Sequence, residues 1–146
     1  MPARLRDVVC PFTMTVRVYW EDTDAGGVVY HAGYVRFLER ARTEWLRSLG
    51  IGQEQLRGDH DRVFAVRWME MDFLKPARLD DELEVGLRVA AARHASMLFE
   101  QVVRRGGEVL LTARVKAVSL TASEFKPCAL SPELLATFKV PEYDPR

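Results

Sequence analysis

Three carboxylates, paired glycines and a histidine lie close together in the segment EDTDAGGVVYHAGY, from Glu21 to Tyr34. Asp24 precedes His31 by seven residues, and a helical pattern begins directly after His31. The first N–H groups of a helix lack partners within the helix and lie at the positive end of its dipole, so they attract anions and developing oxyanions. A carboxylate beside them could attack a carbonyl carbon or activate water while the N–H groups stabilise the oxyanion. This is the arrangement that acyl-transfer hydrolysis needs.

Two other interpretations of this loop compete with catalysis. An acidic loop that contains glycine is commonly only a solvated turn. A calcium site is the second alternative, because Asp22, Asp24 and Gly27 match positions one, three and six of the EF-hand loop. Position five would be Gly26 and position twelve Gly33, so two required ligands are missing and the pattern disfavours calcium.

A long amphipathic helix is predicted directly after the loop, from about Ala32 to Leu49. Its apolar residues recur every three or four positions, which is the period of a helix: Tyr34, Leu38, Ala41, Trp45 and Leu49. Gly50 and Gly52 supply the stop. A helix of about 18 residues spans about 27 Å at about 1.5 Å per residue, enough to cross a small sheet. We expect a sheet to cover the apolar stripe.

Strands are predicted on both sides of this helix. Thr13–Trp20 alternates apolar and polar side chains and leads directly into the acidic loop. Four more strands follow without intervening helices: Val63–Phe73, Glu82–Ala91, Met97–Val103 and Val109–Leu120. Such a run argues for an antiparallel sheet that covers the helix, in an α+β arrangement. Ser131 and Pro132 then begin a short helix that ends near Phe138.

Length and composition fit one domain. The chain has 146 residues, 48% of them hydrophobic, so we expect a single domain over 1–146 with a short N-terminal lead, 1–12, and a loose C-terminal tail, 139–146. Basic and acidic residues number 21 each, which gives no reason to expect nucleic acid as a partner. No apolar stretch could span a bilayer and no signal peptide is recognisable, so we expect a cytoplasmic protein. Metal-ligand, nucleotide-binding and serine-hydrolase motifs are also missing from the sequence.

The segment RVYWEDTDAGGVVYHAGYVRFLERARTEWL resembles the signature of the YbgC-type acyl-CoA thioesterases, in the 4-hydroxybenzoyl-CoA thioesterase branch of the hotdog-fold superfamily. The resemblance continues through FLKPARLDDELEV and Arg93–Gln101 to FKPCALSPEL. It implies a hotdog fold, in which an antiparallel sheet of about five strands wraps around one long central helix. It also implies hydrolysis of an acyl-CoA to free acid and coenzyme A, with no metal and no organic cofactor.

The resemblance further implies roles for single residues. Asp24 matches the catalytic aspartate, as nucleophile or as general base, and the main-chain N–H of His31 matches the group that polarises the thioester carbonyl. The phosphates of coenzyme A would need cations, and the matching residues are Arg93, His94, Ser96 and Lys126. Tyr30 is a candidate for the acyl pocket or for the core. Gly33, a further candidate contact, stands where relatives usually have Asn or Ser, and Cys128 stands where many have a basic residue.

One layer of sheet over one helix leaves a strand edge exposed and encloses no acyl pocket. Two protomers joined edge to edge solve both problems, so we expect a homodimer. The resemblance suggests a homotetramer of paired dimers, with the active site at the protomer boundary. An acyl carrier protein thioesterase and a non-catalytic acyl-binding or scaffold protein remain alternatives, and so does a hydratase or dehydratase acting on enoyl thioesters. The sequence does not select the acyl group.

Overall fold

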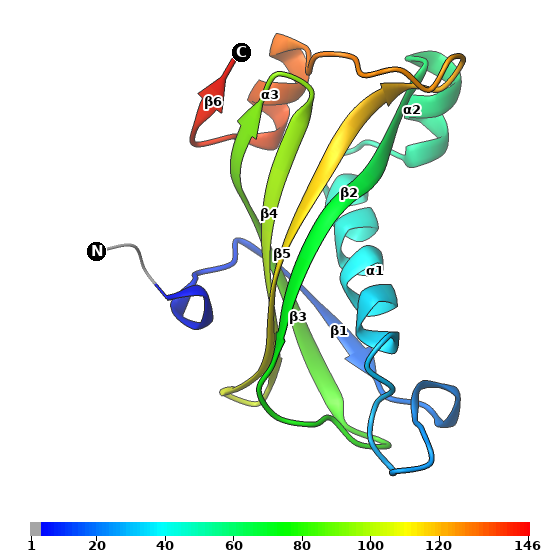
Figure 1. The fold of residues 1–146 in the computed structure, drawn as a ribbon, viewed down its shortest axis with the longest axis vertical. Coiled ribbons are helices and arrows are strands. Elements are labelled where there is room, and N and C mark those ends of the chain that lie inside the picture. The colour runs from blue at the N-terminus through cyan, green and yellow to red at the C-terminus, as the bar shows by residue number, and fades with distance from the viewer. Residues whose placement is uncertain (1–3) are drawn as a thin grey trace.

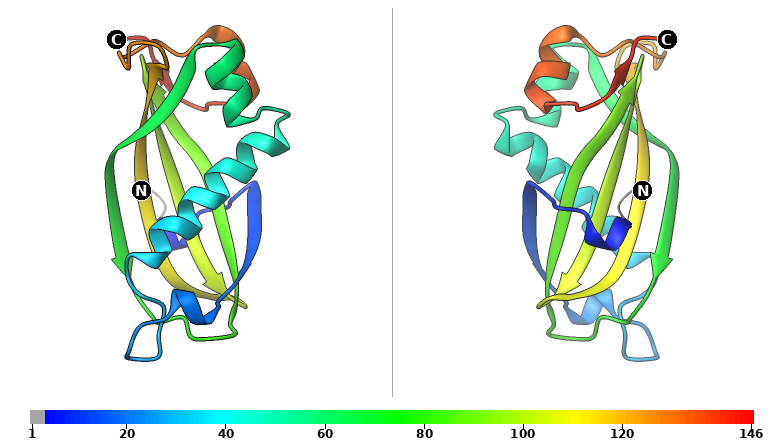
Figure 2. Two further views of the ribbon diagram at one scale, coloured as in Figure 1. Left: turned by 90° about the vertical axis from the view of Figure 1, so that its right-hand side faces the viewer. Right: turned by 90° about the vertical axis from the view of Figure 1, so that its left-hand side faces the viewer.

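The computed structural model describes residues 4–146, and the first three residues of the predicted lead lie outside this range. Five strands form an antiparallel sheet in the order β1-β3-β4-β5-β2 (Figure 1). Their bounds are β1 (Phe12–Arg17), β2 (Arg62–Phe73), β3 (Glu82–Arg93), β4 (Ser96–Arg105) and β5 (Glu108–Thr121). The sheet curves around the long helix α1 (Gly33–Ser48), which lies against one of its faces (Figure 2). This arrangement confirms the predicted α+β hotdog fold.

Helix α1 forms where the apolar period predicts it and ends within one residue of each predicted boundary. One cluster of core residues, including Phe37 and Leu38, packs under the first half of the helix. A second cluster, including Trp45 and Leu46, packs under the last half. Because both halves are buried against the sheet, the first turn of α1 is held at one end of the molecule, next to the acidic loop.

Two shorter helices lie at the other end of the molecule (Figure 1). α2 (Gln53–Asp59) follows α1, and α3 (Pro132–Phe138) follows β5. The hydroxyl of Ser131 accepts a hydrogen bond from the main-chain N–H of Leu134 at 3.1 Å, so Ser131 is the N-cap that the sequence predicts. No helix in the described range 4–146 combines the length and the apolar character that crossing a membrane requires.

The first strand ends at Arg17 and not at Trp20 as predicted. After Arg17 the chain turns into the short 3-10 helix η2 (Trp20–Asp22). The carboxylate of Asp22 closes this turn, because its Oδ2 accepts a hydrogen bond from the main-chain N–H of Tyr19 at 2.8 Å. The alternation of side chains could not reveal this local bond between a side chain and the main chain.

The C-terminal tail is not loose over its whole length, which corrects the prediction. The short strand β6 (Tyr143–Asp144) pairs in parallel with the end of β3. The main-chain N–H of Ala92 donates to the carbonyl of Glu142 at 2.8 Å, and that of His94 donates to the carbonyl of Asp144 at 2.7 Å. The reason lies in the register of the sheet: β1 pairs with β3 only from residue 82 to residue 87, so the last part of that edge is open to β6.

The outer edge of β2 carries exposed apolar side chains. β2 pairs with β5 on one side, and no other strand of the described chain pairs with it on the other side. Val66 is 50% exposed, Trp68 44% and Phe73 50%, and the register of β2 shifts between Val66 and Trp68. An open strand with large exposed apolar side chains is typical of an edge that pairs with another chain.

Candidate active site

Asp24 lies in a tight loop whose main chain is closed by hydrogen bonds. Its main-chain N–H donates to the carbonyl of Val28 at 2.9 Å, and its carbonyl accepts from the N–H of Gly27 at 3.0 Å. Gly27 has a φ of 79°, which glycine adopts without strain. One carboxylate oxygen, Oδ1, accepts from the N–H of Gly26 at 2.8 Å. Oδ2 makes no hydrogen bond with any residue of the described chain, so the exposed carboxylate is oriented but still has an oxygen available.

The loop is tied to the connection between β2 and β3. The main-chain N–H of Val29 donates to the carbonyl of Ala77 at 2.8 Å, and the hydroxyl of Tyr34 accepts from the N–H of Ala77 at 3.1 Å. Val29, Tyr34 and Ala77 are all buried. Burial raises the pKa of Tyr34, so its phenol stays protonated at neutral pH. These bonds fix the loop on both sides of its exposed residues.

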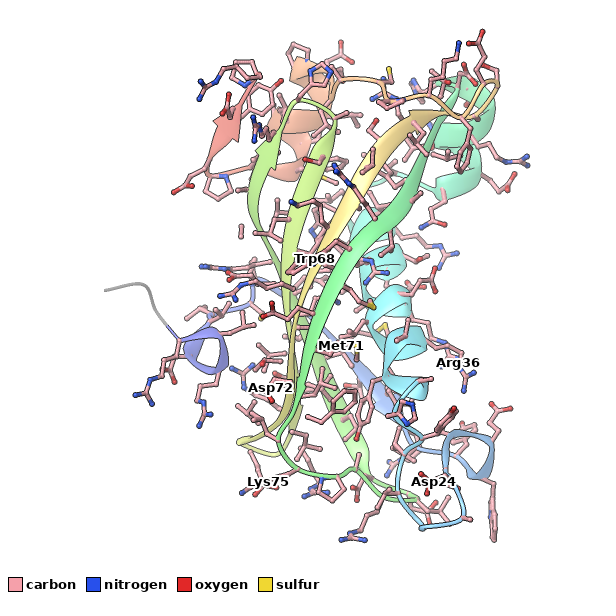
Figure 3. The ribbon with its side chains drawn as sticks, viewed as in Figure 1. Asp24, Arg36, Trp68, Met71, Asp72 and Lys75 are labelled. Atoms are coloured by element: carbon pink, nitrogen blue, oxygen red, sulfur yellow. The ribbon has the colours of Figure 1, made fainter. Side chains whose placement is uncertain are left out.

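The main-chain N–H groups just before α1 are unused. The N–H of Gly33 donates to the carbonyl of Tyr30 at 2.7 Å, and that of Val35 donates to the carbonyl of Ala32 at 3.2 Å. The N–H groups of His31 and Ala32 donate to no atom of residues 4–146. They lie at the positive end of a helix of 16 residues and can therefore bind an anion or a developing oxyanion. The loop of Asp24 leads directly into this helix end (Figure 3).

The remaining residues of the acidic segment differ in their exposure and in their contacts. The rings of Tyr30 and His31 contact edge to face with centroids 4.5 Å apart, and both side chains are exposed. Gly33 is buried, and a Cβ at this position would lie 3.6 Å from Val29 Cγ1, which is ordinary contact. An Asn or Ser at this position would therefore meet no main-chain obstacle at its Cβ. Asp22 is buried, and its carboxylate is occupied by the hydrogen bond from Tyr19. No cluster of three metal-ligating side chains occurs within the described residues.

Three predicted substrate contacts lie at the opposite end of the protomer from Asp24 (Figures 1 and 3). Arg93, His94 and Ser96 form the turn between β3 and β4 and line a cavity of about 280 Å³ on the sheet. Lys126 does not line this cavity, and its ammonium pairs with Glu124 at 3.1 Å. The fold of one protomer therefore does not bring the predicted phosphate contacts to the predicted catalytic residues.

Three cations of this cavity were not predicted from the sequence: Arg67, Lys116 and Arg146. None of the described residues that line the cavity is acidic. Asp144, beside it, accepts hydrogen bonds from the guanidinium of Arg146 at 3.1 Å and lies 4.0 Å from that of Arg93. The bonds from Arg146 hold the pKa of the Asp144 carboxyl below its usual value, so Asp144 stays ionised and positions both arginines. A cavity whose charged lining residues, among those described, are all basic can bind phosphate groups.

The signal for these three residues lies in the strand pairing and not in the sequence. Lys116 on β5 pairs with Trp68 on β2, which places it next to Arg67. β6 brings Arg146 to the end of β3. A prediction of strand order and register would have been needed to find them.

Comparisons with known proteins identify the family of this chain. Residues 26–116 match the family model described as "Thioesterase superfamily". The acyl-CoA thioesterase YbgC of Haemophilus influenzae is 44% identical over 87% of this chain and 93% of its own length. The acyl-CoA thioester hydrolase YbgC of Escherichia coli O157:H7 is 45% identical over 88% of this chain and 96% of its own length.

Solved structures of similar proteins have the same fold. A probable thioesterase from Bartonella henselae is 37% identical and superposes with a TM-score of 0.78, over 82% of this chain and 98% of its own. A hypothetical protein from Aquifex aeolicus is 28% identical and superposes with a TM-score of 0.82, over 88% of this chain and 99% of its own. The chain thus belongs to the thioesterase superfamily and, within it, to the YbgC group.

Proposed function

We propose that this protein is an acyl-CoA thioesterase, which hydrolyses the thioester bond to give a free acid and coenzyme A. The observation that carries the proposal is that one short segment provides both an oriented carboxylate, Asp24, and unused main-chain N–H groups just before α1. The relatives that are 44% and 45% identical over most of the chain are named as acyl-CoA thioesterases, which supports the same substrate class.

The proposed reaction begins when the thioester oxygen accepts a hydrogen bond from the main-chain N–H of His31. Asp24 then either attacks the carbonyl carbon or removes a proton from an attacking water. The C–S bond breaks, and the thiolate of coenzyme A leaves and takes up a proton. In the general-base route the carbonyl carbon keeps the oxygen of the water and the free acid is formed directly. In the nucleophilic route water then hydrolyses the anhydride between the acyl group and Asp24, which releases the acid and restores the carboxylate. The N–H groups stabilise the oxyanion, an effect worth about 10² to 10³ in rate for a single donor. An acyl group trapped on Asp24 after a rapid quench would identify Asp24 as the nucleophile.

A homodimer through β2 would complete the site. Two copies of β2 related by a two-fold axis would pair antiparallel and would cover Val66, Trp68 and Phe73. Antiparallel pairing places the end of one protomer that carries Asp24 beside the opposite end of its partner. That end carries the cavity lined by Arg67, Arg93, Lys116 and Arg146, the cation cavity. When an acyl-CoA places its thioester at the loop of Asp24, the catalytic loop, of one protomer, its phosphates would then reach the cation cavity of the partner. A homotetramer and a cytoplasmic location stay predictions from the sequence.

The cation cavity favours coenzyme A over an acyl carrier protein as the carrier. Both present the same phosphopantetheine arm, but coenzyme A adds a nucleotide with further phosphates. Arg67, Arg93, Lys116 and Arg146 provide more positive charge than a single phosphate requires. A purely acyl-binding protein would have no use for an oriented free carboxylate beside unused helix N–H groups.

The test is release of thiol from short, long and aromatic acyl-CoAs by the wild type and by Asp24→Asn. Asparagine keeps the shape of the side chain but can neither act as the nucleophile nor accept a proton from water, so we expect a loss of at least about 10²-fold. Glu21→Gln is the matched control, because Glu21 is an exposed acid of the same segment that makes no hydrogen bond within the described chain. A wild type that hydrolyses no acyl-CoA, or a folded Asp24→Asn that matches the wild type, would refute the proposal.

A further inference from the structure

A second cavity, of about 140 Å³, lies between the last half of α1 and the first half of β2. It shares no lining residue with the catalytic loop or with the cation cavity. Its walls are mainly apolar and include Trp45, Leu46, Phe64, Val66, Met97 and Phe99. Trp45 and Phe99 pack edge to face with centroids 5.4 Å apart, which keeps this part of the wall rigid. Val66 is half exposed, so the cavity opens at the free edge of β2.

A buried cation, Arg42, faces this apolar cavity. Arg42 is 9% exposed, and its guanidinium donates one hydrogen bond, at 2.9 Å, to Oε1 of Gln101. Gln101 is held in turn by a bond from its Nε2 to the carbonyl of Leu38 at 3.1 Å. No carboxylate among residues 4–146 forms an ion pair with Arg42. Four of the five N–H donors of the guanidinium are therefore left without a protein partner.

Burying a cation without a carboxylate partner costs free energy, and burial lowers the pKa of Arg42 accordingly. The carboxylate of Glu39 at the mouth of the cavity is exposed to water and accepts a hydrogen bond from the hydroxyl of Thr43 at 3.2 Å. The charge of Glu39 partly offsets the effect of burial on the pKa of Arg42, but no ion pair joins the two side chains within the described chain, so the guanidinium has no carboxylate bonded to it. A carboxylate is the group that matches a guanidinium best, through two parallel hydrogen bonds.

The position of the cavity relates it to catalysis through the proposed dimer. The end of β2 lies beside the catalytic loop, because Phe73 packs on Tyr34 with ring centroids 5.8 Å apart. The start of β2 lines the cavity. Antiparallel pairing of two β2 edges places the start of one strand beside the end of the other. The cavity of one protomer would then lie next to the catalytic loop of its partner, where the acyl group is held.

We propose that this cavity receives the distal end of the acyl group and that Arg42 selects acyl groups that end in a carboxylate, as in the thioester of a dicarboxylic acid. The inference rests on the proposed acyl-CoA thioesterase function and names its substrate class. The apolar walls hold the methylene groups of the acyl chain, and the guanidinium of Arg42 pairs with the terminal carboxylate.

The experiment measures binding of two thioether analogues of equal chain length, S-butyl-CoA and S-(3-carboxypropyl)-CoA, by titration calorimetry. These analogues cannot be hydrolysed, so the readout does not depend on activity. A charge-assisted hydrogen bond is worth about ten- to a hundredfold in affinity, so the wild type is expected to prefer the carboxylate analogue by about that factor. Arg42→Met removes the preference. Arg40→Met is the matched control and keeps it, because Arg40 is exposed on the same helix and makes no ion pair within the described chain.

Arg42→Lys keeps the experiment decisive where Arg42→Met does not fold. Lysine retains the positive charge but cannot form the two parallel bonds, so the preference falls severalfold without vanishing. A wild type that binds both analogues equally overturns the inference, and so does a folded Arg42→Met that keeps the wild-type preference. Hydrolysis of butyryl-CoA and succinyl-CoA is measured alongside. A carboxylate preference without any hydrolysis refutes the proposed function alone, whereas hydrolysis without a preference refutes this inference alone.

Discussion

The hydroxyl of Tyr34 connects the start of α1 to the β2–β3 connection, and its removal tests whether this bond holds the catalytic loop. In Tyr34→Phe the ring keeps its edge-to-face contacts with Phe37 and Phe73, at centroid distances of 6.1 and 5.8 Å. What is lost is the acceptor for the main-chain N–H of Ala77, and Ala77 is completely buried. Leaving a buried donor unsatisfied costs about 1–3 kcal/mol, so we expect the free energy of unfolding to fall by that amount.

The same variant has a signature in the pH dependence. Burial raises the pKa of Tyr34 in the folded protein above its unfolded value of about 10. Between these two pKa values the unfolded chain loses its proton while the folded protein keeps it, so the folded protein binds more protons and its stability falls as the pH rises. The contribution is fully present below about pH 10, the unfolded pKa, and is lost as the pH rises through the folded pKa. Tyr34→Phe lacks this component, so its stability should decline less steeply in alkali than that of the wild type.

The assay is urea unfolding at one fixed protein concentration, because association with a partner would shift the apparent stability. Tyr143→Phe is the control: Tyr143 is 40% exposed and its hydroxyl makes no hydrogen bond within residues 4–146. Its effect should lie within about 0.5 kcal/mol of zero, as for most surface substitutions. If Tyr34→Phe is as stable as Tyr143→Phe at neutral pH, the bond to Ala77 does not hold the loop and the reasoning is wrong.

Two further predictions concern the dimer and the nucleotide site. Trp68→Lys places a charge on the open edge of β2 and should shift the protein toward monomers in sedimentation velocity. Trp20→Lys is the control and should not shift it, because Trp20 is an exposed tryptophan outside the sheet. An unchanged assembly state in Trp68→Lys would exclude this edge as the interface. Arg93→Ala should raise KM for acyl-CoA by about ten- to a hundredfold at nearly unchanged kcat, since a charge-assisted contact to phosphate is worth about 1.5–3 kcal/mol. Arg57→Ala on α2 is its control, and a KM equal to that control would remove the cavity from the substrate site.

The sequence predicted those features whose causes are local. The apolar period of α1 depends on residues three and four positions apart, so its boundaries were predicted within one residue. The N-cap at Ser131 depends on a bond to Leu134, three residues away. The loop of Asp24 and the start of α1 are likewise adjacent in the chain, which is why both ends of the candidate catalytic pair could be named before the fold was known.

Features that depend on strand pairing escaped prediction. The bulge between Val66 and Trp68 changes which side chains of β2 face α1, and only the register with β5 reveals it. The C-terminal tail carries no strong apolar alternation, yet β6 forms because β1 leaves the last part of the β3 edge unpaired. The composition of the tail therefore did not predict that it would be ordered. The deciding factor was an open row of main-chain donors and acceptors elsewhere in the sheet.

The same distinction separates chemistry from specificity in this protein. A reacting carboxylate and the N–H groups of a helix end can be supplied by one continuous segment, and substitutions outside it need not disturb them. The proposed phosphate site takes cations from β2, β3, β5 and the residues after β6 together, and the proposed site for the acyl end uses Arg42 on α1 opposite β2 and β4. Both proposed recognition sites therefore depend on the packing of the whole sheet. Neither of them lies next to Asp24 within one protomer. Changes in substrate preference should map to the sheet and to the β2 edge, whereas loss of the chemical step should map to the segment from Asp24 to His31.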